Sequence, residues 1–305
     1  MIDVVIQAGA LILLGVLWRV WSPSGLEGDT LRHSLTTLVY VLLLPALALV
    51  VLWKAPLGTE ALTVAGLAFA GLAVGFGSAW AWYRFRSVSR PQMGALLLAA
   101  TFPNATYMGL PVLEVTLGPW ARSIAIQYDL FACTPVLLSA GVLMAARYGD
   151  AVEPIHPLRM LMRVPPLWGA LAGVLLNLGG VPLPDLLDGL LELLGSAVVP
   201  LMLFSIGLGL RWMGSGTRML GQLWPVLVIQ LLLTPAVIWW ATGMLAMGEG
   251  LRAGIVLEAA MPSMVLGIVL CDRYRLDVAL YAMAVTLSTA LSLITLPFWF
   301  GMTGA

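Results

Sequence analysis

The chain has 305 residues, of which 61% are hydrophobic and only 10% are charged, and its formal net charge at pH 7 is zero. No soluble globular domain of this length needs so much apolar surface, so the composition excludes an ordinary soluble fold. It indicates an integral membrane protein, surrounded by the lipid bilayer, and we expect no nucleic-acid partner.

Apolar runs bounded by Arg, Gly or Pro follow one another along the chain, and most approach the roughly 20 residues that a helix needs to cross a bilayer. The first run follows Asp3 rather than a basic residue and is too long for a signal-peptide core, so we expect it to remain as a helix. The sequence therefore predicts an all-α membrane protein with ten transmembrane helices. The ten runs cover roughly residues 4–21, 31–53, 60–83, 91–116, 121–147, 161–179, 186–210, 219–247, 250–271 and 277–300.

The fourth run is interrupted near its middle by the sequence TFPNATYMGLP, residues 101–111. Proline has no amide hydrogen and clashes with the preceding helical turn, so Pro103 must leave backbone groups unpaired. Such groups are tolerated only where protein or a water-filled cavity surrounds them. A second interruption surrounds Pro262 in the ninth run. One such proline could be a kink in a packed helix, but paired interruptions in corresponding halves are typical of a transporter binding site.

The two halves of the chain resemble each other on either side of a central polar connection. Five spans in each half is an odd number, so equivalent helices must cross the membrane in opposite directions. We therefore expect an inverted repeat of five plus five helices, with residues 1–150 as the first repeat and 151–305 as the second. The matched prolines are Pro45 with Pro200 and Pro103 with Pro262.

The basic residues favour one orientation in the cytoplasmic (inner) membrane. With both termini outside, twelve of the fifteen basic residues face the cytoplasm, as the positive-inside rule requires. The three that remain outside are Lys54, Arg122 and Arg252. Glu114 and Glu192 lie close to the same outer interface, where solvation accounts for their charges.

Few residues in this chain are suited to metal binding or catalysis. His33 and His156 lie in separate basic connections, and two scattered histidines cannot build a metal site, so we expect no metal. The chain has no HExxH pattern, and Lys54 is its single lysine, which excludes a phosphate-binding loop lysine. We expect a non-enzyme without a cofactor. A membrane-embedded enzyme and a non-transporting sensor or assembly partner are the alternatives.

The paired interruptions also suggest what the protein binds. A broken helix presents a half-helix amino terminus, whose free amides and positive dipole end attract anions. We therefore expect a small organic anion, a carboxylate, to bind where the two breaks meet. The alternative is that the polar side chains there only cap the helix ends. The candidate substrate-binding residues are Pro103, Asn104, Thr106, Gly109, Pro262 and Ser263.

Two acids lie inside apolar runs. Asp129 and Glu258 are each roughly 12 to 14 Å from the start of their helices, at a rise of about 1.5 Å per residue. Acids at this depth are costly and usually functional, so both are candidates for coupling transport to a proton or to sodium. Asp129 could instead be a protonated structural acid that bonds Thr134 or a freed carbonyl.

The sequence of residues 101–111 resembles the first crossover of the auxin efflux carrier family, which includes plant PIN-type auxin exporters and bacterial carriers of small carboxylates. Residues 259–262, 272–277 and 288–289 look like the second crossover and the last helix of that family. The resemblance implies that Asn104 helps to hold the substrate carboxylate. It also implies a scaffold from spans 1, 2, 6 and 7, often a homodimer interface, and a transport domain from spans 3–5 and 8–10 that moves as an elevator. Plant members have an acid in the third span, and residues Leu62 to Tyr83 of this chain contain none, so a coupling acid must lie elsewhere.

Overall fold

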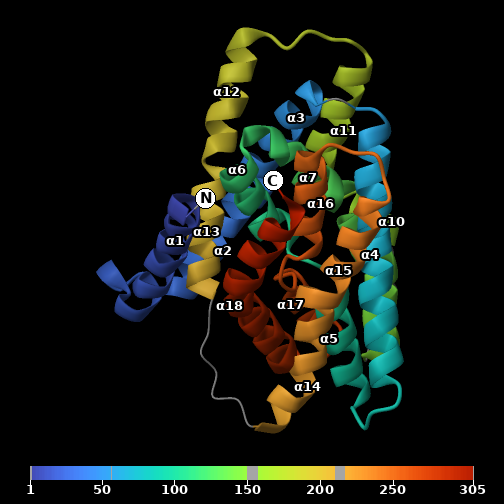
Figure 1. Ribbon diagram of the computed structural model, residues 1–305. Coiled ribbons are helices and arrows are strands. Elements are labelled where there is room, and N and C mark those ends of the chain that lie inside the picture. Colours follow the sequence, from blue (N-terminus) through green and yellow to red (C-terminus); the bar gives the residue numbers. More distant parts are fainter. Residues whose placement is uncertain (1, 56, 150–156, 210–216, 305) are drawn as a thin grey trace. The chain divides into compact units, whose positions relative to one another are not determined.

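The computed structural model describes residues 2–55, 57–149, 157–209 and 217–304, and every regular element in these ranges is a helix (Figure 1). The all-helical prediction is therefore confirmed for the described residues. Most of the central polar connection, with His156, and the basic residue Arg211 lie outside them.

The α-helices are α1 Ile2–Trp21, α2 Gly28–Leu38, α3 Leu44–Lys54, α4 Thr59–Tyr83, α5 Arg90–Thr101, α6 Leu110–Leu117, α7 Arg122–Tyr128, α8 Thr134–Val136, α9 Val142–Tyr148, α10 Pro157–Leu161, α11 Pro165–Leu178, α12 Asp185–Ser196, α13 Val198–Gly209, α14 Thr217–Val228, α15 Thr234–Gly243, α16 Glu249–Ala259, α17 Gly267–Arg273 and α18 Val278–Thr303. Short 3-10 turns lie at η1 Pro23–Gly25 and η4 Pro119–Ala121. Single π-helical turns lie at η2 Val39–Leu43, η3 Ala105–Gly109, η5 Asp129–Cys133, η6 Leu137–Gly141 and η7 Ile229–Leu233.

Six of the continuous helical segments among the described residues are long and apolar enough to cross a membrane. They are Gly28–Lys54, Thr59–Tyr83, Pro119–Tyr148, Asp185–Gly209, Met219–Gly243 and Val278–Thr303, with shorter apolar helices at Gly9–Trp21 and Pro165–Leu178. The helices that contain the two interruptions are divided into pieces too short to span by themselves. The chain is thus a multi-pass membrane protein, and the repeat of five plus five helices stays a prediction.

The positions of most π-helical turns are determined by the prolines that follow them. Four of the five end two residues before a proline, which then occupies the second position of the following α-helix. Proline removes one backbone donor and its ring clashes with a carbonyl in the preceding turn, and a wider π turn relieves that clash. The prolines concerned are Pro45, Pro111, Pro135 and Pro235.

The chain forms two compact units. Unit 1 comprises Met1–Thr63, Thr106–Leu130 and Leu161–Leu210. Within it α3 packs against α11 and α12, while α13 packs against α1 and α2. The helices α3 and α11 approach closely because α11 has glycine at its contact positions: a Cβ at Gly173 would come within 2.6 Å of the Leu49 carbonyl oxygen.

The side chain of Asn177 on α11 strengthens the contact between α3 and α11. Its Nδ2 donates hydrogen bonds to the carbonyl oxygens of Leu52, Trp53 and Ala55 at 3.1, 2.7 and 2.8 Å. The last carbonyls of a helix have no partner within it, so Asn177 stabilises the carboxyl end of α3.

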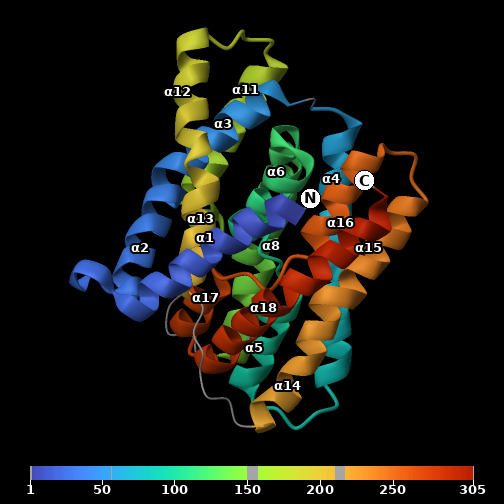
Figure 2. The ribbon, with the colours of Figure 1, turned by 60° about the vertical axis from the view of Figure 1, so that its left-hand side comes forward.

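Unit 2 comprises Val64–Ala105, Phe131–Met160 and Arg211–Ala305. Its long helix α18 packs against α5, α14, α16 and α17, as Figure 2 shows for the helices at the carboxyl-terminal end of the chain. This unit holds both predicted interruptions. The first follows α5 and the second separates α16 from α17.

Candidate functional site

The two interruptions meet within unit 2 and pair through their backbones. The chain is extended between α5 and η3 and again between α16 and α17, and Pro103 lies antiparallel to Ser263. The Asn104 N–H donates to the Pro262 carbonyl at 2.8 Å, and the Met264 N–H donates to the Phe102 carbonyl at 2.9 Å. Each break thereby supplies partners for backbone groups that the other break frees, which hydrocarbon could not do.

Both the backbone N–H and the side-chain hydroxyl of Ser263 donate hydrogen bonds that hold the two interruptions in place. Its hydroxyl donates to the Ala99 carbonyl at 2.7 Å, in the last turn of α5, and its N–H donates to Ser288 Oγ on α18 at 3.1 Å. The capping role weighed for Ser263 from the sequence is therefore present. Its hydroxyl proton is used, so in this conformation Ser263 can offer a ligand only an acceptor.

Asn104 differs from Ser263 in having spare hydrogen-bonding capacity. Its side chain is 2% exposed, and its Oδ1 has no hydrogen-bond partner within the described chain. An unmet polar group at such burial costs about 1–3 kcal/mol, so it points to a ligand or to a water. The side-chain amide can also rotate to present its NH₂ group, because the same terminal group carries both donor and acceptor.

Thr106 follows Asn104 by two residues and is described in unit 1. It lies in the π turn η3, which ends at Gly109, and its hydroxyl donates to Asp129 Oδ2 at the start of η5. Both side chains are buried. The sequence suggested Thr134 or a freed carbonyl as the partner of a structural Asp129, and it did not predict this contact with Thr106.

Glu258 lies in the last turn of α16 in unit 2, and its side chain is completely buried. Asp129 belongs to unit 1. The joint role of the two acids in coupling stays a prediction.

A fourth polar group in unit 2, Gln230, was not predicted from the sequence. Gln230 lies in the π turn η7 and is 1% exposed, and its Nε2 donates to the Met261 carbonyl at 2.9 Å, next to Pro262. The signal that could have found it is an amide in the middle of the apolar stretch VLVIQLLLTP, residues 226–235 of the eighth run. Polar side chains are rare at that depth and usually make specific contacts.

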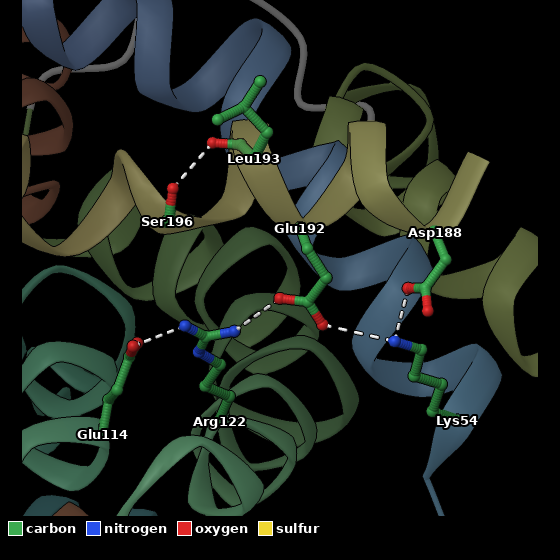
Figure 3. A network of polar contacts seen from close by, with 7 residues as sticks. All are labelled: Lys54, Glu114, Arg122, Asp188, Glu192, Leu193 and Ser196. Atoms are coloured by element: carbon green, nitrogen blue, oxygen red, sulfur yellow. Dashed lines mark hydrogen bonds and ion pairs between the residues drawn. The ribbon is translucent and has the colours of Figure 1, made fainter. Parts of the chain in front are cut away.

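Unit 1 contains a chain of ion pairs that joins α3, α6, α7 and α12 (Figure 3). Arg122 pairs with Glu114 and, at 3.1 Å, with Glu192, while Lys54 pairs with Glu192 at 3.4 Å and with Asp188. Solvation alone therefore does not account for Glu114, whose side chain is only 18% exposed. Lys54 and Arg122, both predicted to face outside, lie in one network, and the side of the membrane on which it lies stays a prediction.

Among the residues that the structure describes, no group of three or more His, Cys, Asp or Glu side chains could hold a metal ion. Cys133 and Cys271 are both buried, and they do not form a disulfide. The polar side chains described at the two interruptions are those of Asn104 and Ser263, an amide and a hydroxyl.

Long apolar helices together with two broken helices that pair backbone to backbone define a polytopic α-helical protein of the transporter class. The family model described as membrane transport protein matches residues 5–300. The chain therefore belongs to this family, the auxin efflux carrier family, as its first crossover motif suggested.

Two relatives have the same designation. The chain is 29% identical over 306 residues to an uncharacterized transporter of Methanothermobacter thermautotrophicus, covering 97% of this chain and 96% of the relative. It is 27% identical over 214 residues to an uncharacterized transporter of Methanocaldococcus jannaschii, covering 68% of each chain. The family and the names of these relatives indicate a transporter rather than an enzyme.

Proposed function

We propose that this protein is a secondary transporter that moves a small organic anion, a carboxylate, across the cytoplasmic membrane. The observation that carries the proposal is the buried Asn104 side chain, which lies where the two interruptions pair and has an unpartnered terminal amide group that, once rotated, presents its NH₂ donor to a carboxylate. Helical residues begin directly after it, at Ala105. The first amides of a helix have no partner within it and carry its positive dipole end, so a carboxylate is favoured beside Asn104.

The existing hydrogen bonds of the candidate residues limit which of them can donate a hydrogen bond to an anion. Ser263 and Thr106 both use their hydroxyl protons, on the Ala99 carbonyl and on Asp129 respectively. The Asn104 amide and the backbone amides that follow it are the donors available to an anion. Because these donors are neutral, they can hold a carboxylate without fixing the net charge of the site.

The contact between Thr106 and Asp129 supports a way to couple anion binding to a proton. While Asp129 is ionised, it accepts the Thr106 hydroxyl. Once protonated, Asp129 becomes a donor, and the Thr106 hydroxyl no longer has to donate to it. An anion nearby favours the protonated carboxyl, so proton uptake would accompany substrate binding. If sodium is the coupling ion, Asp129 and Glu258 stay ionised and act as oxygen ligands.

For the architecture, we propose the inverted repeat of five plus five helices with both termini outside. Spans 1, 2, 6 and 7, which correspond to α1, α2–α3, α11 and α12–α13, form a scaffold that mediates a homodimer. Spans 3–5 and 8–10 form a transport domain that moves as an elevator and carries the crossover. The pairing of the two interruptions supports this assignment, because broken helices at a repeat interface are where such carriers bind their substrates.

A matched pair of asparagine variants tests the proposed site. Purified protein is screened by thermal shift against mono- and dicarboxylates at two pH values, since a ligand that binds only the folded state raises its melting temperature. Asn104→Ala should keep nearly the wild-type melting temperature without ligand and lose the shift with ligand. Asn177→Ala removes three hydrogen bonds that cap α3, so it should lower the melting temperature and keep the shift.

The loss expected for Asn104→Ala is that of one hydrogen bond to a charged group, about 1.5–3 kcal/mol, or roughly ten- to a hundred-fold in affinity. The opposite pattern, with a large drop in melting temperature and an unchanged dissociation constant, would make Asn104 a helix cap.

A further inference from the structure

The orientation of the Gln230 amide is fixed by its partner. A carbonyl oxygen can only accept a hydrogen bond, so the Nε2 group must face the Met261 carbonyl, 2.9 Å away. The Oε1 atom therefore points elsewhere, and within the described residues it has no hydrogen-bond partner. A buried acceptor without a donor is unfavourable, and a bound cation or a donor group would satisfy it.

A second unsatisfied acceptor lies one turn further along the same helix. Thr234 begins α15, four residues after Gln230, so the two side chains share a face. It is 4% exposed, and no partner for its Oγ1 is found in the described part of the chain. By contrast, the buried hydroxyl of Thr242 on the same helix donates to the Trp239 carbonyl at 2.8 Å. Thr234 is thus available to a ligand and Thr242 is not.

The register between α15 and α16 brings a carboxylate level with these oxygens. The two helices pack against each other and are joined by the short connection 244–248, so they run in opposite directions. Two contacts agree on the register: Gln230 with Met261, and the Arg252 guanidinium over the Trp239 ring at 5.5 Å.

Moving four residues forward from Gln230 on one helix corresponds to moving three or four residues back from Met261 on the other. This places Thr234 level with Leu257 and its neighbour Glu258. The Glu258 side chain is completely buried, and it lies at the carboxyl end of α16, where the helix dipole adds partial negative charge.

From this arrangement we propose that unit 2 contains a buried binding site for sodium, built from the side-chain oxygens of Gln230, Thr234 and Glu258. One carboxylate and two neutral oxygens balance a single positive charge, and hard cations prefer such oxygen ligands. Carbonyls and half-helix carboxyl ends near broken helices are typical sodium ligands in transporters. The sodium proposal does not depend on the proposed carboxylate site, because sodium would bind here even if the protein bound no organic anion.

Sodium-dependent thermal stability tests the site without any substrate. The melting temperature of the purified protein is measured in sodium, potassium and choline chloride at equal ionic strength. In wild-type protein it should rise with sodium concentration, because the ion binds only the folded state, and it should not rise in the other two salts. Thr234→Val, which removes one oxygen at nearly constant shape, should abolish this rise, and so should Gln230→Met.

Two control variants separate loss of the site from general damage. Thr242→Val should keep the full sodium response, because its hydroxyl is satisfied within its own helix, and Thr234→Ser should restore the response by retaining the oxygen. Equal wild-type melting temperatures in the three salts would overturn the proposal. A sodium response that survives in a folded Thr234→Val protein would do the same.

Discussion

Replacing Arg122 tests whether the ion-pair network in unit 1 stabilises the fold. Its side chain is 9% exposed and pairs with Glu114 on α6 and Glu192 on α12. The two carboxylates differ in environment, since Glu114 is 18% exposed and Glu192 is 42% exposed. Loss of the arginine therefore leaves one carboxylate in water and the other largely buried without its counter-charge.

The difference in solvent exposure between Glu114 and Glu192 determines how much free energy of unfolding each substitution is expected to lose. Removing one partner of a buried ion pair costs about 3–5 kcal/mol, and since Glu114 retains some solvent, we expect Arg122→Gln to lose about 3 kcal/mol. An exposed pair is worth about 0–1 kcal/mol, so Glu192→Gln should lose no more than about 1 kcal/mol. Neutralising Glu114 in the Arg122→Gln background should restore much of the loss, because no uncompensated buried charge then remains.

The assay is the free energy of unfolding of the detergent-purified protein, measured by denaturant titration for Arg122→Gln, Glu192→Gln, Glu114→Gln and the double variant Arg122→Gln/Glu114→Gln. A coupling energy in this cycle isolates the pair from other effects of each substitution. If Arg122→Gln were no less stable than Glu192→Gln, the reasoning from burial would be refuted.

Topology and coupling each give a further prediction. Single cysteines at Gly58 and Arg86 should react with a membrane-impermeant reagent from opposite sides, since the third span separates them. Labelling of both cysteines from the same side would contradict the proposed topology. Asp129→Asn should leave anion binding largely intact and remove its pH dependence, as measured by ligand titration at two pH values. Glu258→Gln should remove the sodium dependence of transport. Should both acid variants keep wild-type ion dependence, neither acid is the coupling group.

Local rules were enough to predict where the helices break. Proline has no amide hydrogen wherever it stands, so Pro103 and Pro262 ended or distorted their helices as the sequence predicted. The same rule accounts for the π turns before other prolines, although nothing in the sequence shows that the strain is relieved by a wider turn rather than by a kink.

Side-chain contacts between separate helices could not be predicted. Gln230 reaches Met261 only because α15 and α16 pack in one particular register, which depends on side-chain packing along both helices. Glu114 meets Arg122 because Gly118, with φ of 99°, and the turn after it redirect the chain between α6 and α7. The sequence alone does not show the partner of Gln230 or that of Glu114, and the structure supplies both.

Uptake of a labelled carboxylate into proteoliposomes tests the central claim most directly. The substrate is the carboxylate that gives the largest thermal shift, and the proteins are wild type, Asn104→Ala and Asn177→Ala. The account predicts saturable uptake by wild type and by Asn177→Ala, with an apparent affinity roughly ten- to a hundred-fold weaker in Asn104→Ala. Saturable uptake by Asn104→Ala with wild-type affinity would contradict it, because the crossover amide would then not hold the substrate.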